Sequence, residues 1–193
     1  MSHAIASIGW LPDAGGALHR AGAEGKLAFL NFSQAPRCAG SVALERDVYT
    51  DERVAVLISA RFVPARMIRS EAPQDATRFN VSWTPTFVIA EPDGTERHRL
   101  VGFLPIEDFL AQIELGLAKA EFGRERFVDA QRAFEDVVAR YAHTHAGPES
   151  DYWAGVSRYK QDKDRLFLKA TAERLRGRYP SSEWTIRASV WLA

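Results

Sequence analysis

The pattern of apolar and polar positions in the first 120 residues alternates between helix and strand periods. Short apolar runs bounded by turn-forming residues predict strands at 27–32, 62–68 and 86–90. A fourth strand at 96–102 is predicted to return as a hairpin after the turn Glu91-Pro92-Asp93-Gly94. Pro64 lies inside the second strand, which favours a place at one end of the strand or an edge strand because proline cannot donate to a sheet ladder.

The segments between these strands carry helical periodicity. The predicted helices cover 10–24, 39–47, 73–79 and 106–119. A further helix is predicted along the apolar stretch that follows the N-cap signal Thr50-Asp51-Glu52. Crossover units followed by a hairpin indicate an α/β fold with a mixed sheet and flanking helices on both faces.

From residue 120 onward the pattern predicts helices alone. Four are expected: one along 127–141, one after Pro148, one along 166–179 and one after Pro180 that carries Trp184 to Trp191. Tyr141 precedes Trp153 by the same spacing as Tyr179 precedes Trp191, an offset of 38 residues. This offset favours stacked helix hairpins, with chance recurrence in aromatic-rich helices as the alternative. The chain is therefore expected to hold one domain over 1–120 and an all-α helical-hairpin region over 121–193.

Composition narrows the function classes. The 193 residues include 25 basic and 25 acidic side chains, so no charge excess indicates nucleic acid or an anionic membrane as partner. No run reaches the roughly 18 apolar residues of a membrane helix, and the N-terminus has no leader-peptide pattern. With a single cysteine the chain can form no internal disulfide. We therefore expect a cytoplasmic protein with no membrane association.

Three features of the first domain carry the candidate chemistry. Cys38 follows a buried strand at the start of a predicted helix, and Ser41 follows it after two residues. A helix N-terminus favours a thiolate, because free N–H groups and the helix dipole stabilise negative charge. Trp83-Thr84-Pro85 runs into the third strand, and Thr84-Pro85 is a candidate cis peptide bond beside the sulfur.

These features resemble the thioredoxin superfamily, over about residues 11–118. The resemblance implies a thioredoxin-like fold, a nucleophilic Cys38 and a substrate-binding loop at Trp83, Thr84 and Pro85. The matching segments are 29–32, Cys38-Ala39-Gly40-Ser41, 44–54, 62–64, 81–87, Pro92-Asp93-Gly94 and 101–105. The helical tail resembles tetratricopeptide-type helix pairs more loosely.

Three positions depart from the family pattern. Ser41 stands where the second cysteine is expected, which leaves a CxxS motif. Arg37 stands where a tryptophan usually precedes the first cysteine, and Asn31 replaces a buried acid on the central strand. A hydroxyl cannot resolve a mixed disulfide and an amide cannot carry a proton, so only one-thiol chemistry is expected.

Two functions of different classes follow. The first is monothiol thiol–disulfide exchange or redox sensing, with Cys38 as nucleophile and Ser41 as hydrogen-bond donor to its thiolate. Protein thiols or glutathione would be the partners, and no cofactor or metal is expected. The second is a non-catalytic scaffold that binds a protein or peptide through the Thr84-Pro85 loop or the helical tail.

Other motifs favour structural interpretations. His143 and His145 form a pair without a familiar metal-ligand spacing and are expected in a solvated loop. Arg97-His98-Arg99 is a short basic patch that could attract glutathione carboxylates, but a solvated edge strand is the preferred interpretation. The stretch 13–16 lacks the strand-then-helix context of a phosphate loop, and no Ser/His/Asp signature is present.

Overall fold

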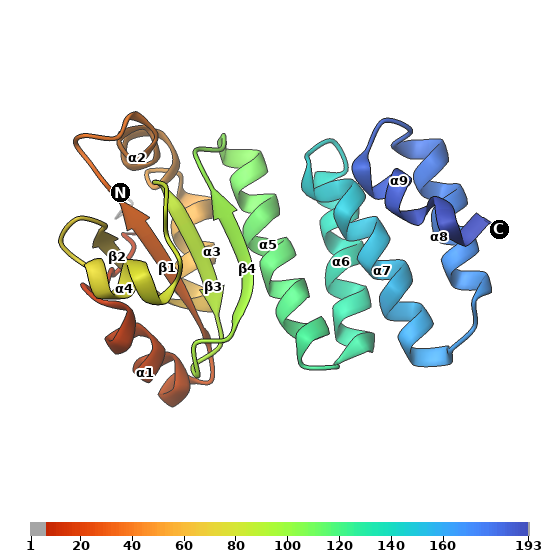
Figure 1. Cartoon of the computed structure of the whole chain (residues 1–193), viewed down its shortest axis with the longest axis horizontal. Coiled ribbons are helices and arrows are strands. Elements are labelled where there is room, and N and C mark those ends of the chain that lie inside the picture. The colour runs from red at the N-terminus through yellow and green to blue at the C-terminus, as the bar shows by residue number, and fades with distance from the viewer. Residues whose placement is uncertain (1–6, 193) are drawn as a thin grey trace, which may run out of the picture. The chain divides into compact units, whose positions relative to one another are not determined.

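The computed structural model describes residues 7–192, and the chain divides into two compact units with a boundary between Ile106 and Glu107 (Figure 1). Residues 1–6 lie outside the described residues. Two predictions fall partly on them: the lack of a leader-peptide pattern, and the start of the first domain at residue 1. The predicted division at 120 stays a prediction, and each unit is described by itself.

The first unit is built on a mixed four-stranded sheet. Its strands are β1 (Leu27–Ser33), β2 (Phe62–Ile68), β3 (Thr86–Ala90) and β4 (Glu96–Val101), in the order β2-β1-β3-β4. β1 pairs in parallel with β2 and antiparallel with β3, and β3 forms the hairpin with β4. The mixed sheet is confirmed, and β2 is an outer strand, as Pro64 indicated.

Four helical segments accompany this sheet. They are α1 (Ala14–Glu24), α2 (Ala39–Ala43) with its π-helical continuation η1 (Leu44–Val48), α3 (Glu52–Arg61) and α4 (Pro73–Arg78). The start predicted for the first helix, residue 10, is wrong. Leu11 instead forms an isolated bridge to Ala65 of β2, and the Asp13 side chain accepts a hydrogen bond from the Gly16 N–H at 2.6 Å, which caps the helix at Ala14.

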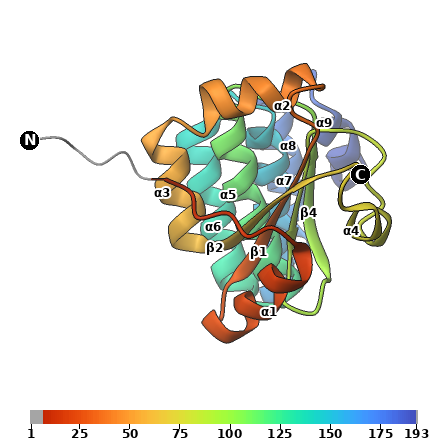
Figure 2. The same ribbon diagram turned by 90° about the vertical axis from the view of Figure 1, so that its left-hand side faces the viewer.

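Helices cover both faces of the sheet (Figure 2). On one face, α1 and α4 share a buried apolar cluster with alternate residues of the strands, among them Leu30, Phe32 and Val88. On the other face, Phe29 packs against Phe62 and Phe87 at ring-centroid distances of 5.5 and 5.6 Å, and the buried Ile58 belongs to α3, which packs against β2. β1 is buried along its whole length, as its continuous apolar run predicted.

The second unit is helical throughout its described part. It contains α5 (Ile106–Gly123), which begins at the boundary, α6 (Phe127–Tyr141), α7 (Ala146–Asp162), α8 (Leu166–Arg178) and α9 (Glu183–Ala188) with the 3-10 turn η2 (Ser189–Leu192). Within residues 7–192 no helix combines the length and the apolar character that crossing a bilayer requires.

Three of the predicted helix limits in this region are wrong. α5 continues past 119 to Gly123, and α7 begins at Ala146 and so includes Pro148 in its first turn, where proline is tolerated. The last helix ends at Ala188. The Ser189 hydroxyl donates to the Ile186 carbonyl at 2.7 Å, and the chain tightens into the 3-10 turn that carries Trp191.

The two tyrosines of the predicted repeat lie at helix ends, since Tyr141 ends α6 and Tyr179 follows α8. The two tryptophans differ in local structure: Trp153 lies in the regular helix α7 and Trp191 in the 3-10 turn. Both contact Tyr152, at centroid distances of 5.5 and 4.6 Å, so they join one aromatic cluster. The tetratricopeptide resemblance stays a prediction.

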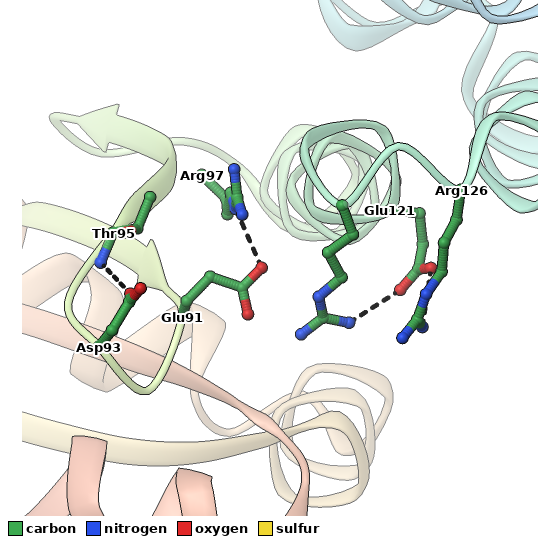
Figure 3. Close-up of polar contacts among 7 residues, drawn as sticks. Glu91, Asp93, Thr95, Arg97, Glu121 and Arg126 are labelled. Atoms are coloured by element: carbon green, nitrogen blue, oxygen red, sulfur yellow. Dashed lines mark hydrogen bonds and ion pairs between the residues drawn. The ribbon is translucent and has the colours of Figure 1, made fainter.

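Ion pairs and a hydrogen bond to a carboxylate stabilise two of the turns (Figure 3). In the β3–β4 hairpin, the Arg97 guanidinium donates to Glu91 at 2.9 Å and the Thr95 N–H to Asp93 at 2.8 Å. The backbone hydrogen bond from Thr95 holds the pKa of Asp93 below its usual value. In the turn between α5 and α6, Glu121 pairs with Arg124 and Arg126 at 3.0 and 3.3 Å.

The contact between α7 and α8 yields a stability prediction. A Cβ atom added at Gly155 would lie 2.0 Å from Thr171 Oγ1 and 2.7 Å from Thr171 Cβ. Gly155→Ala is therefore expected to lower the free energy of unfolding by about 2–3 kcal/mol through overpacking. Gly177→Ala, where nothing lies within 4 Å, is the matched control and should be neutral or stabilising by up to ~1 kcal/mol. Urea unfolding followed by circular dichroism measures both, and equal stabilities would contradict the close packing of these helices.

Candidate functional site

The sheet topology places the chemistry of the first unit at one edge. In the antiparallel β1–β3 pair, Phe32 near the end of β1 lies opposite Thr86 at the start of β3. The loop that leaves β1 and the loop that enters β3 therefore emerge side by side. The first loop carries Cys38 and the second carries Thr84 and Pro85.

Cys38 occupies the N-cap position of α2 with extended backbone angles, φ −116° and ψ 116°. Its N–H donates to the Gln34 carbonyl at 2.9 Å, and its own carbonyl accepts from the Val42 N–H at 3.0 Å. Its Sγ lies 3.3 Å from the Thr84 carbonyl oxygen, to which the thiol donates. The cysteine is partly exposed, so its sulfur is held by both loops without being sealed from solvent.

The surroundings of Cys38 act on its pKa in opposite directions. Burial alone would raise the pKa of the thiol, but hydrogen bonds from the side chains of Ser41 and Thr84 and from the backbone N–H groups of Ser41 and Gly40 lower it. The balance holds the pKa of Cys38 below its ordinary value. Donors at the first turn of a helix stabilise the anion, and their effect prevails here.

Ser41 is buried beneath this turn, with 1% of its surface exposed. Its Oγ accepts a hydrogen bond from the Gln34 N–H at 3.2 Å. This bond uses a lone pair of the hydroxyl and leaves its proton available to another acceptor. The Ser41 side chain thus ties the loop after β1 to the first turn of α2.

The Thr84–Pro85 peptide bond is cis, as predicted, and Ala35–Pro36 is a further cis bond that was not predicted. The Pro85 carbonyl accepts from the Gly102 N–H at 2.8 Å, and the Thr86 hydroxyl donates to the Trp83 carbonyl at 2.9 Å. These bonds hold the loop at the start of β3, whereas the Trp83 side chain itself is 68% exposed.

The sulfur opens into a surface groove formed by both loops and the end of β4. The groove is lined by Gln34, Arg37, Cys38, Ala39, Gly40, Arg69, Ser82, Trp83, Thr84, Pro85, Gly102 and Phe103. The structure thus brings together all five residues expected from the sequence, with Ser41 beneath the turn and the other four on the groove. Arg69 and Phe103 were not predicted as site residues. Arg69 lies in none of the segments that match the family, and Phe103 lies in the matching segment 101–105, but nothing local links its side chain to Cys38.

Asn31 lies within the sheet, 2% exposed. Its side-chain N–H donates to the Tyr49 hydroxyl at 2.5 Å, and its Oδ1 has no hydrogen-bond partner among residues 7–192. Burial raises the pKa of Tyr49, which keeps this phenol neutral. The pair therefore offers no group that exchanges a proton near neutrality.

The basic patch on β4 is neutralised within the first unit. Arg97 pairs with Glu91 at 2.9 Å, and Arg99 pairs with Glu96 and donates to the Phe79 carbonyl at 2.7 Å. A solvated edge strand was predicted here. β4 is an edge strand, but these arginines are only partly exposed. Neither residue lines the groove at Cys38.

His143 and His145 lie at the turn between α6 and α7, where His145 occupies the N-cap position of α7. Across the described residues, no three His, Cys, Asp or Glu side chains gather closely enough to hold a metal ion.

A central mixed sheet, a cysteine at a helix N-terminus and an adjacent cis-proline loop together define the thioredoxin-like class of folds. The model of the family described as "Thioredoxin-like domain" matches residues 15–116, and the chain belongs to this family.

Solved structures agree with this assignment. A thioredoxin from Thermus thermophilus is 30% identical, with a TM-score of 0.53 over 61% of this chain and 93% of that one. A putative disulphide-isomerase from Bacteroides thetaiotaomicron is 26% identical, with a TM-score of 0.52 over 59% and 96%. A DsbH oxidoreductase shares the fold at 13% identity, with a TM-score of 0.51 over 61% and 90%. A search of curated proteins returned no match.

The first turn of α2 and the proline loop yield a second prediction. A Cβ at Gly40 would lie 3.0 Å from Pro85 Cδ and 3.5 Å from Phe103 Cβ. Gly40→Ala should therefore push the turn away from Thr84, slow the alkylation of Cys38 severalfold and cost about 1 kcal/mol of stability. Because Cys38 is the sole cysteine, the rate of iodoacetamide labelling measures the reactivity of this thiol alone.

Gly22→Ala in α1, where the added Cβ meets Pro92 at an ordinary 3.4 Å, is the control and should leave the labelling rate unchanged. If Gly40→Ala labels as fast as the unmodified chain, the spacing between α2 and Pro85 does not govern the reactivity of the sulfur.

Proposed function

We propose that this chain carries out thiol–disulfide exchange of monothiol type, with Cys38 as the nucleophile. The observation that carries the proposal is the placement of the Cys38 sulfur, which is partly exposed on an open groove and lies among donors that favour the thiolate. A cysteine that served packing alone would be buried in apolar surroundings, where the thiol form is favoured.

The reaction follows from the groups present. The Cys38 thiolate attacks one sulfur of a substrate disulfide, a new bond to Sγ forms, the substrate S–S bond breaks, and the departing thiolate takes a proton from water. A second thiol, such as glutathione, then attacks the mixed disulfide and releases Cys38 as a thiolate. Each step exchanges one S–S bond for another, so no cofactor is needed.

Ser41 is the proposed donor to the Cys38 thiolate. Hydrogen bonding from its side chain lowers the pKa of Cys38, and its buried position near the turn fixes the hydroxyl. A hydroxyl cannot attack the mixed disulfide, and the Asn31–Tyr49 pair supplies no proton-transfer group, so release depends on an external thiol.

The loop at Trp83, Thr84 and Pro85 is the proposed binding surface for the substrate. Within the described residues the Thr84 N–H has no backbone hydrogen bond, which suits it to pair with an extended substrate chain beside the sulfur. Protein thiols or glutathione are the proposed partners, and the helical tail is a proposed surface for protein binding. This chemistry suits the cytoplasm, where a glutathione pool keeps thiols reduced.

The monothiol assignment makes a third prediction. The chain should reduce insulin only weakly with a dithiol as the recycling reductant, yet glutathione disulfide should add one glutathione per chain, detected by intact mass. Cys38→Ser should abolish the adduct. Ser41→Cys should place a resolving thiol one helical turn from Cys38 and raise insulin reduction at least about tenfold.

Two results would contradict this assignment. Strong insulin reduction by the unmodified chain would show that no second cysteine is required. Absence of any adduct, with Cys38 also inert to alkylation, would instead favour the scaffold function, in which the exposed Trp83 binds a protein without covalent chemistry.

A further inference from the structure

A second hollow lies along α4 beside the groove at Cys38. That hollow is lined by Arg69, Ser70, Pro73, Ala76, Thr77, Asn80, Val81 and Ser82. Arg69 and Ser82 line both hollows, so the two adjoin at these residues, and together they are called the trough here. A short peptide attached to Cys38 has a surface along which to lie.

The charges along this trough are of one sign. Arg37 and Arg69 line it, and no aspartate or glutamate is among the lining residues of either hollow. Asp75 of α4 accepts a hydrogen bond from the Ala14 N–H at 3.2 Å, so its carboxylate is directed to α1 instead.

The two arginines are available to a ligand. Arg37 is exposed, and within residues 7–192 neither arginine forms an ion pair. Arg69 is fixed by one bond, from its Nε to the Val81 carbonyl at 2.9 Å, which leaves its two terminal nitrogens for other acceptors. The arginines of β4, by contrast, are already paired with glutamates.

We infer that Arg37 and Arg69 make this site selective for anionic disulfides, with carboxylate-bearing peptide disulfides such as glutathione disulfide as the substrate class. The inference rests on the proposed exchange at Cys38. The arginines act by attracting and orienting the carboxylates of the substrate, while the sulfur exchange itself is unchanged: a bond from Sγ to one glutathione sulfur forms as the disulfide breaks, and one glutathione thiolate departs and is protonated by water.

A charge series of disulfides tests this selectivity. Glutathione disulfide is anionic at neutral pH, bis-hydroxyethyl disulfide is neutral and cystamine is cationic. The rate of adduct formation at Cys38 is measured for each by intact mass. Each rate is divided by the rate of the same disulfide with thioglycerol, a neutral thiol that is not a half of any of the three reagents, which removes differences in intrinsic reactivity. The expected normalised rates favour glutathione disulfide by about threefold to tenfold over the neutral reagent, with cystamine slowest.

Variants test which residues cause the preference for glutathione disulfide over the neutral reagent. Arg37→Gln and Arg69→Gln should each reduce this preference about twofold to threefold, and the double variant should remove it. Arg69→Lys, which keeps the charge, should retain most of it. Arg61→Gln, an exposed site at the end of α3 that does not line the trough, should leave it unchanged. Raising the salt concentration to about 0.5 M should weaken the preference through screening.

The outcomes separate the two proposals. Equal normalised rates for all three reagents, or a preference for cystamine, would overturn the selectivity while leaving the exchange function in place. A preference that survives the double variant would overturn the role of these arginines. No adduct with any reagent would overturn the exchange function and the selectivity with it.

Discussion

The antiparallel pairing of β1 with β3 is the constraint on which the site depends. It sets Phe32 opposite Thr86, so that the chain leaves β1 and enters β3 at the same edge of the sheet. Cys38 and Thr84 are 46 positions apart in sequence, yet the cysteine sulfur lies 3.3 Å from the threonine carbonyl. The close approach also requires Gly40, because a larger side chain there would meet the Pro85 ring.

This geometry combines two demands on the sulfur. Access requires that Cys38 lie at the surface, and stabilisation of the thiolate requires donors close to it. The first turn of α2 meets both, since Gly40 and Ser41 present backbone N–H groups while one side of the cysteine faces the groove. Serine at position 41 and asparagine at position 31 offer neither a second thiol nor a buried acid, and the proposed single-thiol function rests on this difference from the family pattern.

The sequence predicted the elements whose signals are local. The continuous apolar run of β1 and Pro64 in an outer strand follow from burial and hydrogen bonding within a few residues. The grouping of Cys38 with Trp83, Thr84 and Pro85 was predictable because their order along the chain resembles a known family. Helix limits that depend on capping or tertiary contacts were harder to predict from the sequence. α1 begins after the predicted residue because Leu11 pairs with β2, and α9 ends before the predicted residue because the chain forms a 3-10 turn from Ser189.

Electrostatic partners were the least predictable feature. Arg97 and Arg99 look like a free basic patch in the sequence, but folding pairs them with Glu91 and Glu96. Arg69 carries no local signal of function, and only the connection of β2 to α4 brings it to the groove. The charge along the groove is therefore set by tertiary structure rather than by neighbours in sequence.

Hydrogen bonds at the first turn of α2, including that from Ser41, hold the pKa of Cys38 below its ordinary value. An NMR titration of an isotope-labelled Cβ at this single cysteine, in the unmodified chain and in Ser41→Ala, measures this effect directly. The midpoint should lie below the value of about 8.5 for free cysteine and should shift upward on loss of the Ser41 hydroxyl. A midpoint at or above that value, or one that Ser41→Ala leaves unmoved, would show that these hydrogen bonds do not lower the pKa of Cys38.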